Sequence, residues 1–200
     1  MKHAMRLVGV AGVLVLLVVL SGCFFNIFQT AQTVGAGNVA LTLGAAAMNI
    51  AVQQQNSLVF TPQGRLAVGL TDNLDLGIQS GAMVGTDGSA SFLGAIADLK
   101  ARIVNIENGF ALALGVGGGY SPGLVGWGIE GSVYLDSNVR FLPLYVVYRP
   151  LLPLGGGQLT IANQVAVGLY LRLSSSARLL LEADWWSGLP SIGAALEVSL

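Results

Sequence analysis

The 200-residue sequence has few charged residues, one cysteine and one histidine. Asp, Glu, Lys and Arg together make up 10% of the chain, against roughly 25% in an average soluble domain. Acidic residues slightly outnumber basic ones, a balance without the basic excess typical of nucleic-acid binding. His3 and Cys23 both lie near the N-terminus. The rest of the sequence therefore lacks the side chains for disulfides, most transition-metal sites and histidine-dependent hydrolysis.

The first 23 residues have the pattern of a cleavable export signal. Lys2 and Arg6 flank the start of an uncharged apolar run over residues 7–20, which is shorter than the roughly 20 residues of a membrane-spanning helix. Residues 20–23, reading LSGC, resemble the bacterial lipobox. The resemblance implies cleavage before Cys23, its acylation with fatty acids such as palmitate, and contact with membrane lipid. The alternative is an uncleaved anchor helix that ends in a cysteine by chance.

We therefore expect three segments: a signal peptide over residues 1–22, a short acylated tether over 23–37, and a single domain over 38–200. In the lipoprotein family, an Asp directly after the acylated cysteine usually retains the protein at the inner membrane. Phe24 stands at this position. The resemblance thus implies outward transport by the lipoprotein-sorting machinery.

The chain after Cys23 is hydrophobic, yet it contains no uninterrupted apolar stretch of the length that a spanning helix needs. Its apolar residues instead alternate with small or polar ones, a period of two that is typical of β-strands. Residues 159–173 show this most clearly, and 93–103 and 192–200 repeat it. Turn-forming residues then predict about ten strands, with eight as the alternative, at approximately 38–52, 58–71, 74–85, 90–105, 109–120, 124–135, 139–149, 158–173, 178–186 and 191–200.

Such alternation fits two kinds of closed antiparallel barrel. The apolar face points inward in a soluble barrel and toward lipid in a membrane barrel. The more polar face here carries many Gly and Ala residues rather than a crowd of charges, which favours the inside of a narrow barrel. We therefore predict an all-β fold, a closed antiparallel transmembrane β-barrel. Its apolar face carries aromatic residues near both expected rims, as in the girdles of membrane barrels: Phe110, Tyr120, Trp127, Phe141 and Trp185.

Residues 64–80, reading GRLAVGLTDNLDLGIQS, look like the hairpins of small bacterial outer-membrane β-barrel proteins. The closing GAALEVSL is similar to the C-terminal assembly signal of that family. The resemblance implies recognition by the barrel-assembly machinery and an outer-membrane location, with the acylated end at the periplasmic face. Leu200 stands where the family usually has an aromatic residue, a departure that weakens the assembly signal.

The more polar face also supplies candidates for a polar network inside the barrel. Because unpaired buried charges are costly, structural ion pairs are the favoured interpretation; a ring that guides ions or small solutes is the alternative. Glu182 and Asp184 are two residues apart on one strand, a spacing that would also suit acid–base chemistry on a glycosidic bond. The predicted network comprises Arg65, Asp75, Asp98, Lys100, Arg102, Glu130, Arg140, Gln164, Arg172, Arg178, Glu182, Asp184 and Glu197.

Taken together, these patterns favour a non-enzymatic outer-membrane β-barrel lipoprotein with a structural role or a narrow passive channel. No cofactor, metal or nucleic-acid partner is expected. One alternative is a lipid-anchored periplasmic barrel that binds an apolar ligand. A less favoured one is an enzyme that acts on envelope lipids or glycans.

Overall fold

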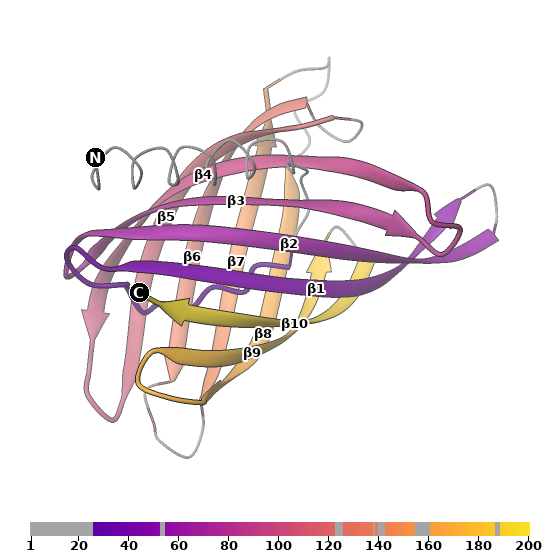
Figure 1. The fold of residues 1–200 in the computed structure, drawn as a ribbon. Coiled ribbons are helices and arrows are strands. Elements are labelled where there is room, and N and C mark those ends of the chain that lie inside the picture. The colour runs from indigo at the N-terminus through magenta and orange to yellow at the C-terminus, as the bar shows by residue number, and fades with distance from the viewer. Residues whose placement is uncertain are drawn as a thin grey trace, which may run out of the picture.

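A computed structural model describes residues 26–52, 55–122, 126–137, 139, 143–154, 161–186 and 189–200. They form ten strands (Figure 1), so the predicted all-β fold and its strand number are confirmed. Among these residues, no helix is long and apolar enough to cross a membrane. The strands are β1 (Val39–Val52), β2 (Gln55–Thr71), β3 (Leu74–Gly85), β4 (Ala90–Asn105), β5 (Phe110–Ser121), β6 (Gly126–Ser137), β7 (Leu144–Pro153), β8 (Ala162–Arg172), β9 (Ala177–Trp186) and β10 (Leu189–Ser199).

The ten strands form a closed antiparallel barrel in which each strand pairs with its neighbours in sequence. β1 closes the ring against β10, with Ala40 opposite Ser199 and Met48 opposite Ser191. Closure gives both edges of the sheet hydrogen-bond partners. This is the condition that a β-structure must meet in lipid.

The barrel has two ends that carry different parts of the chain. The near end carries Asn38 and Leu200 together with the turns that follow β2, β4 and β8, and the C label marks it in Figure 1. The far end carries the turn at residues 86–89, between β3 and β4. The direction from near to far end therefore follows β1 and opposes β10.

Apolar side chains point out of the barrel, and small or polar ones point in. On β8, Val165, Val167 and Leu169 are 38–41% exposed, whereas the alternate residues Gln164 and Ala166 are buried. This orientation is that of a membrane barrel and the reverse of the soluble alternative. The period of two in the sequence indicates which residues face outward, because successive side chains on a strand face opposite sides of the sheet.

The expected position of β7 is wrong by several residues. The sequence places this strand at 139–149, but it spans Leu144–Pro153. The preceding strand β6 continues through Asp136 and Ser137, which the sequence assigns to a turn. Pro143 lies directly before β7 and has no N–H to donate to a neighbouring strand. Its carbonyl accepts a hydrogen bond from the Tyr170 N–H at 2.9 Å.

The expected face of Leu93 is also wrong. The alternation along 93–103 places this side chain outward with Leu99, but Leu93 is buried and packs with Ile96. The pairing of β3 with β4 shifts between Gly81 and Ala82 at a β-bulge. An extra residue at such a bulge reverses which residues face inward, and this reversal turns Leu93 into the barrel.

Candidate functional site

The barrel is filled by the chain's own N-terminal segment. Residues 26–34, which we call the luminal segment, precede β1 and lie within the ring of strands (Figure 1, indigo). Residues 26–31 are at most 3% exposed. The sequence predicts that residues 23–37 form a short acylated tether; of these, residues 26–31 lie buried inside the barrel, whereas Ala36 and Gly37 are exposed. The segment reads NIFQTAQTV and carries no charge, so it can be buried among polar walls that satisfy its backbone.

Glu182, near the middle of β9, holds the inner part of the luminal segment. Its carboxylate accepts the backbone N–H groups of Ile27 at 2.6 Å and Phe28 at 2.8 Å, and the hydroxyl of Tyr145 donates to it at 3.0 Å. Phe28 has a φ of 44°, which L-residues other than Asn and Asp rarely adopt. Successive N–H groups that converge at such a bend form a concave anion site. Glu182 therefore fixes a backbone conformation of the segment that costs energy by itself.

Further along the luminal segment, other strands hold the backbone in the same way. Asp136 accepts the Ala31 N–H at 2.7 Å, and Asp75 accepts the Val34 N–H at 3.0 Å. Lys100 donates to the carbonyls of Thr30 and Gln32 at 3.1 and 2.7 Å. These hydrogen bonds come from β3, β4 and β6, so strands on several sides of the barrel bind the segment.

At the inner end of the segment, Asn26 is bound through both its backbone and its side chain. Its carbonyl accepts hydrogen bonds from Gln63 and Gln79 at 2.9 and 3.0 Å, and its side-chain oxygen accepts one from Ser191 at 2.8 Å. Gln79 lies near the middle of β3 and Ser191 near the far end of β10. The luminal segment thus reaches from the near end to at least the middle of the barrel.

Glycines on β1 and β10 make the space for Phe28. A Cβ added at Gly44 would come within 2.9 Å of the Phe28 ring, and one at Gly193 within 2.6 Å. The two strands are hydrogen-bonded neighbours, so both glycines belong to one wall. These small residues of the barrel lining therefore make room for the luminal segment and do not line an open channel.

The described residues form four ion pairs, and every member except Arg149 belongs to the predicted network. Arg65 binds Asp98 at 2.7 Å, Lys100 approaches Asp75 at 3.4 Å, Arg149 approaches Glu130 at 3.6 Å, and Arg178 binds Glu197 at 2.7 Å. The first three pairs are buried, and the fourth is partly exposed. The interior is therefore crossed by pairs between strands, which fix their relative register.

The remaining predicted lumen residues lie in varied positions. Gln164 donates to Asp184 at 2.6 Å in the buried interior. Arg102 is partly exposed at the near end and binds the side chain of Asn73, and Arg172 is exposed at the same end. Arg140 lies outside the described residues, as does Cys23.

The predicted lipid-facing aromatics that the structure describes are all exposed on the outer wall. They are Phe110 at the near end of β5, and Tyr120, Trp127 and Trp185 toward the far end of β5, β6 and β9. Tyr120 and Trp127 are paired across β5 and β6, with ring centroids 5.2 Å apart. Phe141 lies outside the described residues.

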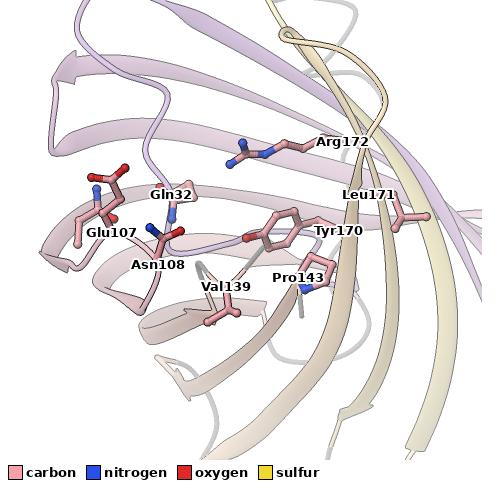
Figure 2. Close-up of a pocket in the computed structure, with 9 residues that line it drawn as sticks. Gln32, Glu107, Asn108, Val139, Pro143, Tyr170, Leu171 and Arg172 are labelled. Carbon is pink, nitrogen blue, oxygen red and sulfur yellow. The ribbon is translucent and has the colours of Figure 1, made fainter. Parts of the chain in front are cut away.

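A cavity of about 1070 Å³ opens at the near end, beside the luminal segment. Figure 2 shows Tyr170 of β8 pointing toward Asn108 in the β4–β5 turn, with Gln32 of the luminal segment and Arg172 beside them. The Tyr170 hydroxyl donates to the Ser137 carbonyl at 2.9 Å. The lining carries several polar groups, so the cavity suits water and small polar solutes rather than an apolar ligand.

Sequence reasoning misses several residues of this site. Asp136 and Arg149 are missed because the strand boundaries predicted from the sequence around β6 and β7 are wrong. The luminal segment is missed because its contacts are made chiefly by backbone groups, and these leave no pattern of side chains in the sequence. Its many amides and hydroxyls without charges are the one available signal.

The arrangement offers little for catalysis. Both oxygens of Glu182 are engaged by the luminal segment and Tyr145, and Asp184 accepts from Gln164. The carboxylate pair is therefore enclosed by protein rather than open to a substrate. Among the described residues, no group of three or more Asp, Glu, His or Cys could hold a metal ion.

Comparisons with known proteins show similarity of structure but not of sequence. No protein-family model matches the chain, and no curated protein sequence does. The N-terminal β-barrel domain of Pseudomonas aeruginosa OprF is 11% identical, with a TM-score of 0.39 and coverage of 83% of this chain and 99% of that one. A KdgM porin is 11% identical, with a TM-score of 0.41 and coverage of 82% and 99%. The Escherichia coli outer-membrane protease OmpT is 11% identical, with a TM-score of 0.38 and coverage of 82% and 96%.

Proposed function

We propose that this protein is an integral β-barrel lipoprotein of the bacterial outer membrane, with a structural role and a lumen that its own N-terminal segment keeps closed. The observation that carries the proposal is the combination of an apolar outer wall with a polar, filled interior. Each strand contributes to both faces. The apolar outside and polar inside typical of a protein in lipid therefore extend around the whole barrel and are not a local patch.

The outer wall supports the membrane location energetically. Exposed large apolar residues occur on all ten strands, among them Leu43, Phe60, Leu76, Leu99 and Val116. Soluble monomers rarely expose a contiguous apolar patch larger than a few hundred Å². Lipid would cover this wall at a gain of about 25 cal/mol for each Å² of apolar surface removed from water.

The interior favours the structural role over an open passive channel. The luminal segment is buried, hydrogen-bonded to β3, β4, β6 and β9, and flanked by three buried ion pairs. A continuous path for solutes would require this segment to move. The polar interior likewise opposes the alternative of a soluble barrel that stores an apolar ligand.

Acylation at Cys23 and closure of the lumen constrain each other. Cys23 precedes Asn26 by three residues, and three residues of any chain span at most about 11 Å. Asn26 binds Gln79 and Ser191 inside the barrel, away from the near end. The closed lumen therefore requires that the acyl chains do not enter the lipid at the near end, because insertion there would draw the luminal segment out.

Extraction of bacterial membranes tests the proposal. We expect wild-type protein and Cys23→Ala to resist alkaline carbonate and urea and, unboiled, to migrate faster than boiled protein on a denaturing gel. Release of the folded Cys23→Ala protein into water would overturn the membrane-barrel proposal. Palmitate labelling of the wild type but not of Cys23→Ala tests the lipid anchor separately, and density-gradient fractionation tests the outer-membrane location.

A further inference from the structure

We infer that withdrawal of the luminal segment converts the barrel into a cation-selective pathway, with Asp136, Glu182 and Asp184 as the groups that attract the cation. This inference rests on the proposed function, because it assumes a barrel that spans a membrane. It adds an activity to the structural role and names the residues responsible for its selectivity.

The charge balance of the interior is the first step. Nine charged residues are buried among those that the structure describes: Arg65, Asp75, Asp98, Lys100, Glu130, Asp136, Arg149, Glu182 and Asp184. Three are cations and six are carboxylates. Each cation forms one buried ion pair, with Asp98, Asp75 or Glu130. Asp136, Glu182 and Asp184 form no ion pair within the described part of the chain.

These three carboxylates are held by neutral donors instead. Glu182 accepts from Ile27, Phe28 and Tyr145, Asp136 from Ala31, and Asp184 from Gln164. One oxygen of Asp136 and one of Asp184 are buried without a hydrogen-bond partner among the described residues. Two of the three therefore depend on backbone N–H groups of the luminal segment, and none of the three is in a salt bridge with a cation of the described strands.

The luminal segment carries no charged side chain, so its withdrawal leaves the surplus of three carboxylates among the buried residues in place. Arg102 and Arg172 stand at the near-end mouth, outside this buried set. Water that replaces the segment hydrates and ionises them. Rings and clusters of Asp and Glu in a narrow aqueous path favour cations over anions. The vacated space would have the small wall of Gly44, Gly193, Ala46 and Ala195, which a hydrated small cation can pass.

The carboxylates are also arranged along the length of the barrel. Asp136 is the next-to-last residue of β6 at the near end, whereas Glu182 lies mid-strand on β9 and Asp184 two residues farther from the near end. Tyr170, which lines the near-end cavity, binds the carbonyl of Ser137 beside Asp136. The cavity thus leads a solute from the near end to the first carboxylate, and the others follow at greater depth.

Recordings from planar lipid bilayers under a KCl gradient test this inference with the full-length chain. Ile27→Pro removes one N–H that Glu182 accepts, and Gly193→Ala crowds the ring of Phe28. Both variants should show conductance steps far more often than the wild type, with permeability for K⁺ severalfold above that for Cl⁻. Wild-type protein held at high voltage should show rare openings of the same selectivity, so the test does not depend on the folding of either variant.

Neutralising the carboxylates provides the decisive comparison. Asp136→Asn, Glu182→Gln and Asp184→Asn, combined in the Gly193→Ala background, should bring the permeability ratio close to one. Asp87→Asn is the matched control. Asp87 lies in the exposed far-end turn, where hydrogen bonds from Ser89 hold its pKa below the usual range and keep it charged.

The outcomes separate the two proposals. Protein that is extracted from membranes by carbonate contradicts the proposed function. Protein that stays embedded and heat-modifiable but never conducts, or conducts without preferring K⁺, overturns the cation pathway alone. Selectivity that survives the triple substitution also overturns it.

Discussion

The backbone N–H of Phe28 donates a hydrogen bond of 2.8 Å to the carboxylate of Glu182, across 154 residues of sequence. Phe28 is held there with a positive φ, and the Ile27 N–H reaches the same carboxylate. One side chain on β9 thus positions a segment that begins before the first strand. The contact links the folding of the N-terminal segment to the closure of the barrel, and it is the point at which the closed state is most easily tested.

Glu182→Ala should loosen the luminal segment. The substitution leaves two buried N–H groups without their acceptor, at a cost of about 1–3 kcal/mol each. Hydrogen exchange at the Ile27 and Phe28 amides should then become faster by a factor of ten or more, since about 1.4 kcal/mol corresponds to tenfold. Glu107→Ala, in the exposed β4–β5 turn, should leave the exchange unchanged. Equal protection in both variants would show that Glu182 does not hold the segment.

Gly193→Ala should displace Phe28 and also strain the seam between β1 and β10, because the added Cβ would lie 2.9 Å from the Ala45 carbonyl oxygen. The added Cβ would come within 2.6 Å of the Phe28 ring and 2.8 Å of Ala46, closer than real Cβ contacts allow. Protease added to liposome-embedded protein should cleave the luminal segment faster than in the wild type. Gly131→Ala serves as the control, because the nearest atom to its added Cβ is Pro150 Cγ at 4.0 Å. Cleavage at the wild-type rate would contradict the assigned packing of Phe28.

Arg149→Met should destabilise the barrel strongly. It leaves Glu130 as a buried carboxylate without its cation, which costs about 3–5 kcal/mol in comparable buried pairs. The free energy of unfolding in urea, measured in lipid vesicles, checks this. Adding Glu130→Gln should recover part of the loss because it removes the unpaired charge. Additive losses from the two substitutions would mean that the pair is not coupled.

Val167→Lys should impair insertion into the bilayer. Val167 is exposed near the middle of β8, where a charged side chain facing the centre of the lipid costs about 2–4 kcal/mol. Leu173→Lys, just beyond the near end of β8, should cost about 0–1 kcal/mol because it lies toward the interface. Folding yields into lipid vesicles measure the difference. A similar effect of both substitutions would contradict the assignment of the outer wall to lipid.

The sequence by itself determined the strand number and the two faces of the barrel. A period of two is a local property, so residues such as Val165, Val167 and Leu169 report their common face without any knowledge of the fold. It fails where the local period is interrupted. Leu93 is the unpaired residue of a bulge that depends on pairing with β3, and β7 starts later than expected because β6 runs on through Ser137.

The tertiary structure alone decided which polar groups meet inside. Alternation directs Glu182 and Asp184 inward, but it does not say that one accepts backbone N–H groups from residues 27 and 28 while the other accepts from Gln164. Nor does it show that Arg178 pairs with Glu197 and leaves those carboxylates to neutral donors. The physical reason is that every peptide has the same N–H and C=O groups. A segment held mainly through its backbone therefore carries no side-chain signature, and its place in the lumen emerges only when the ring of strands has closed around it.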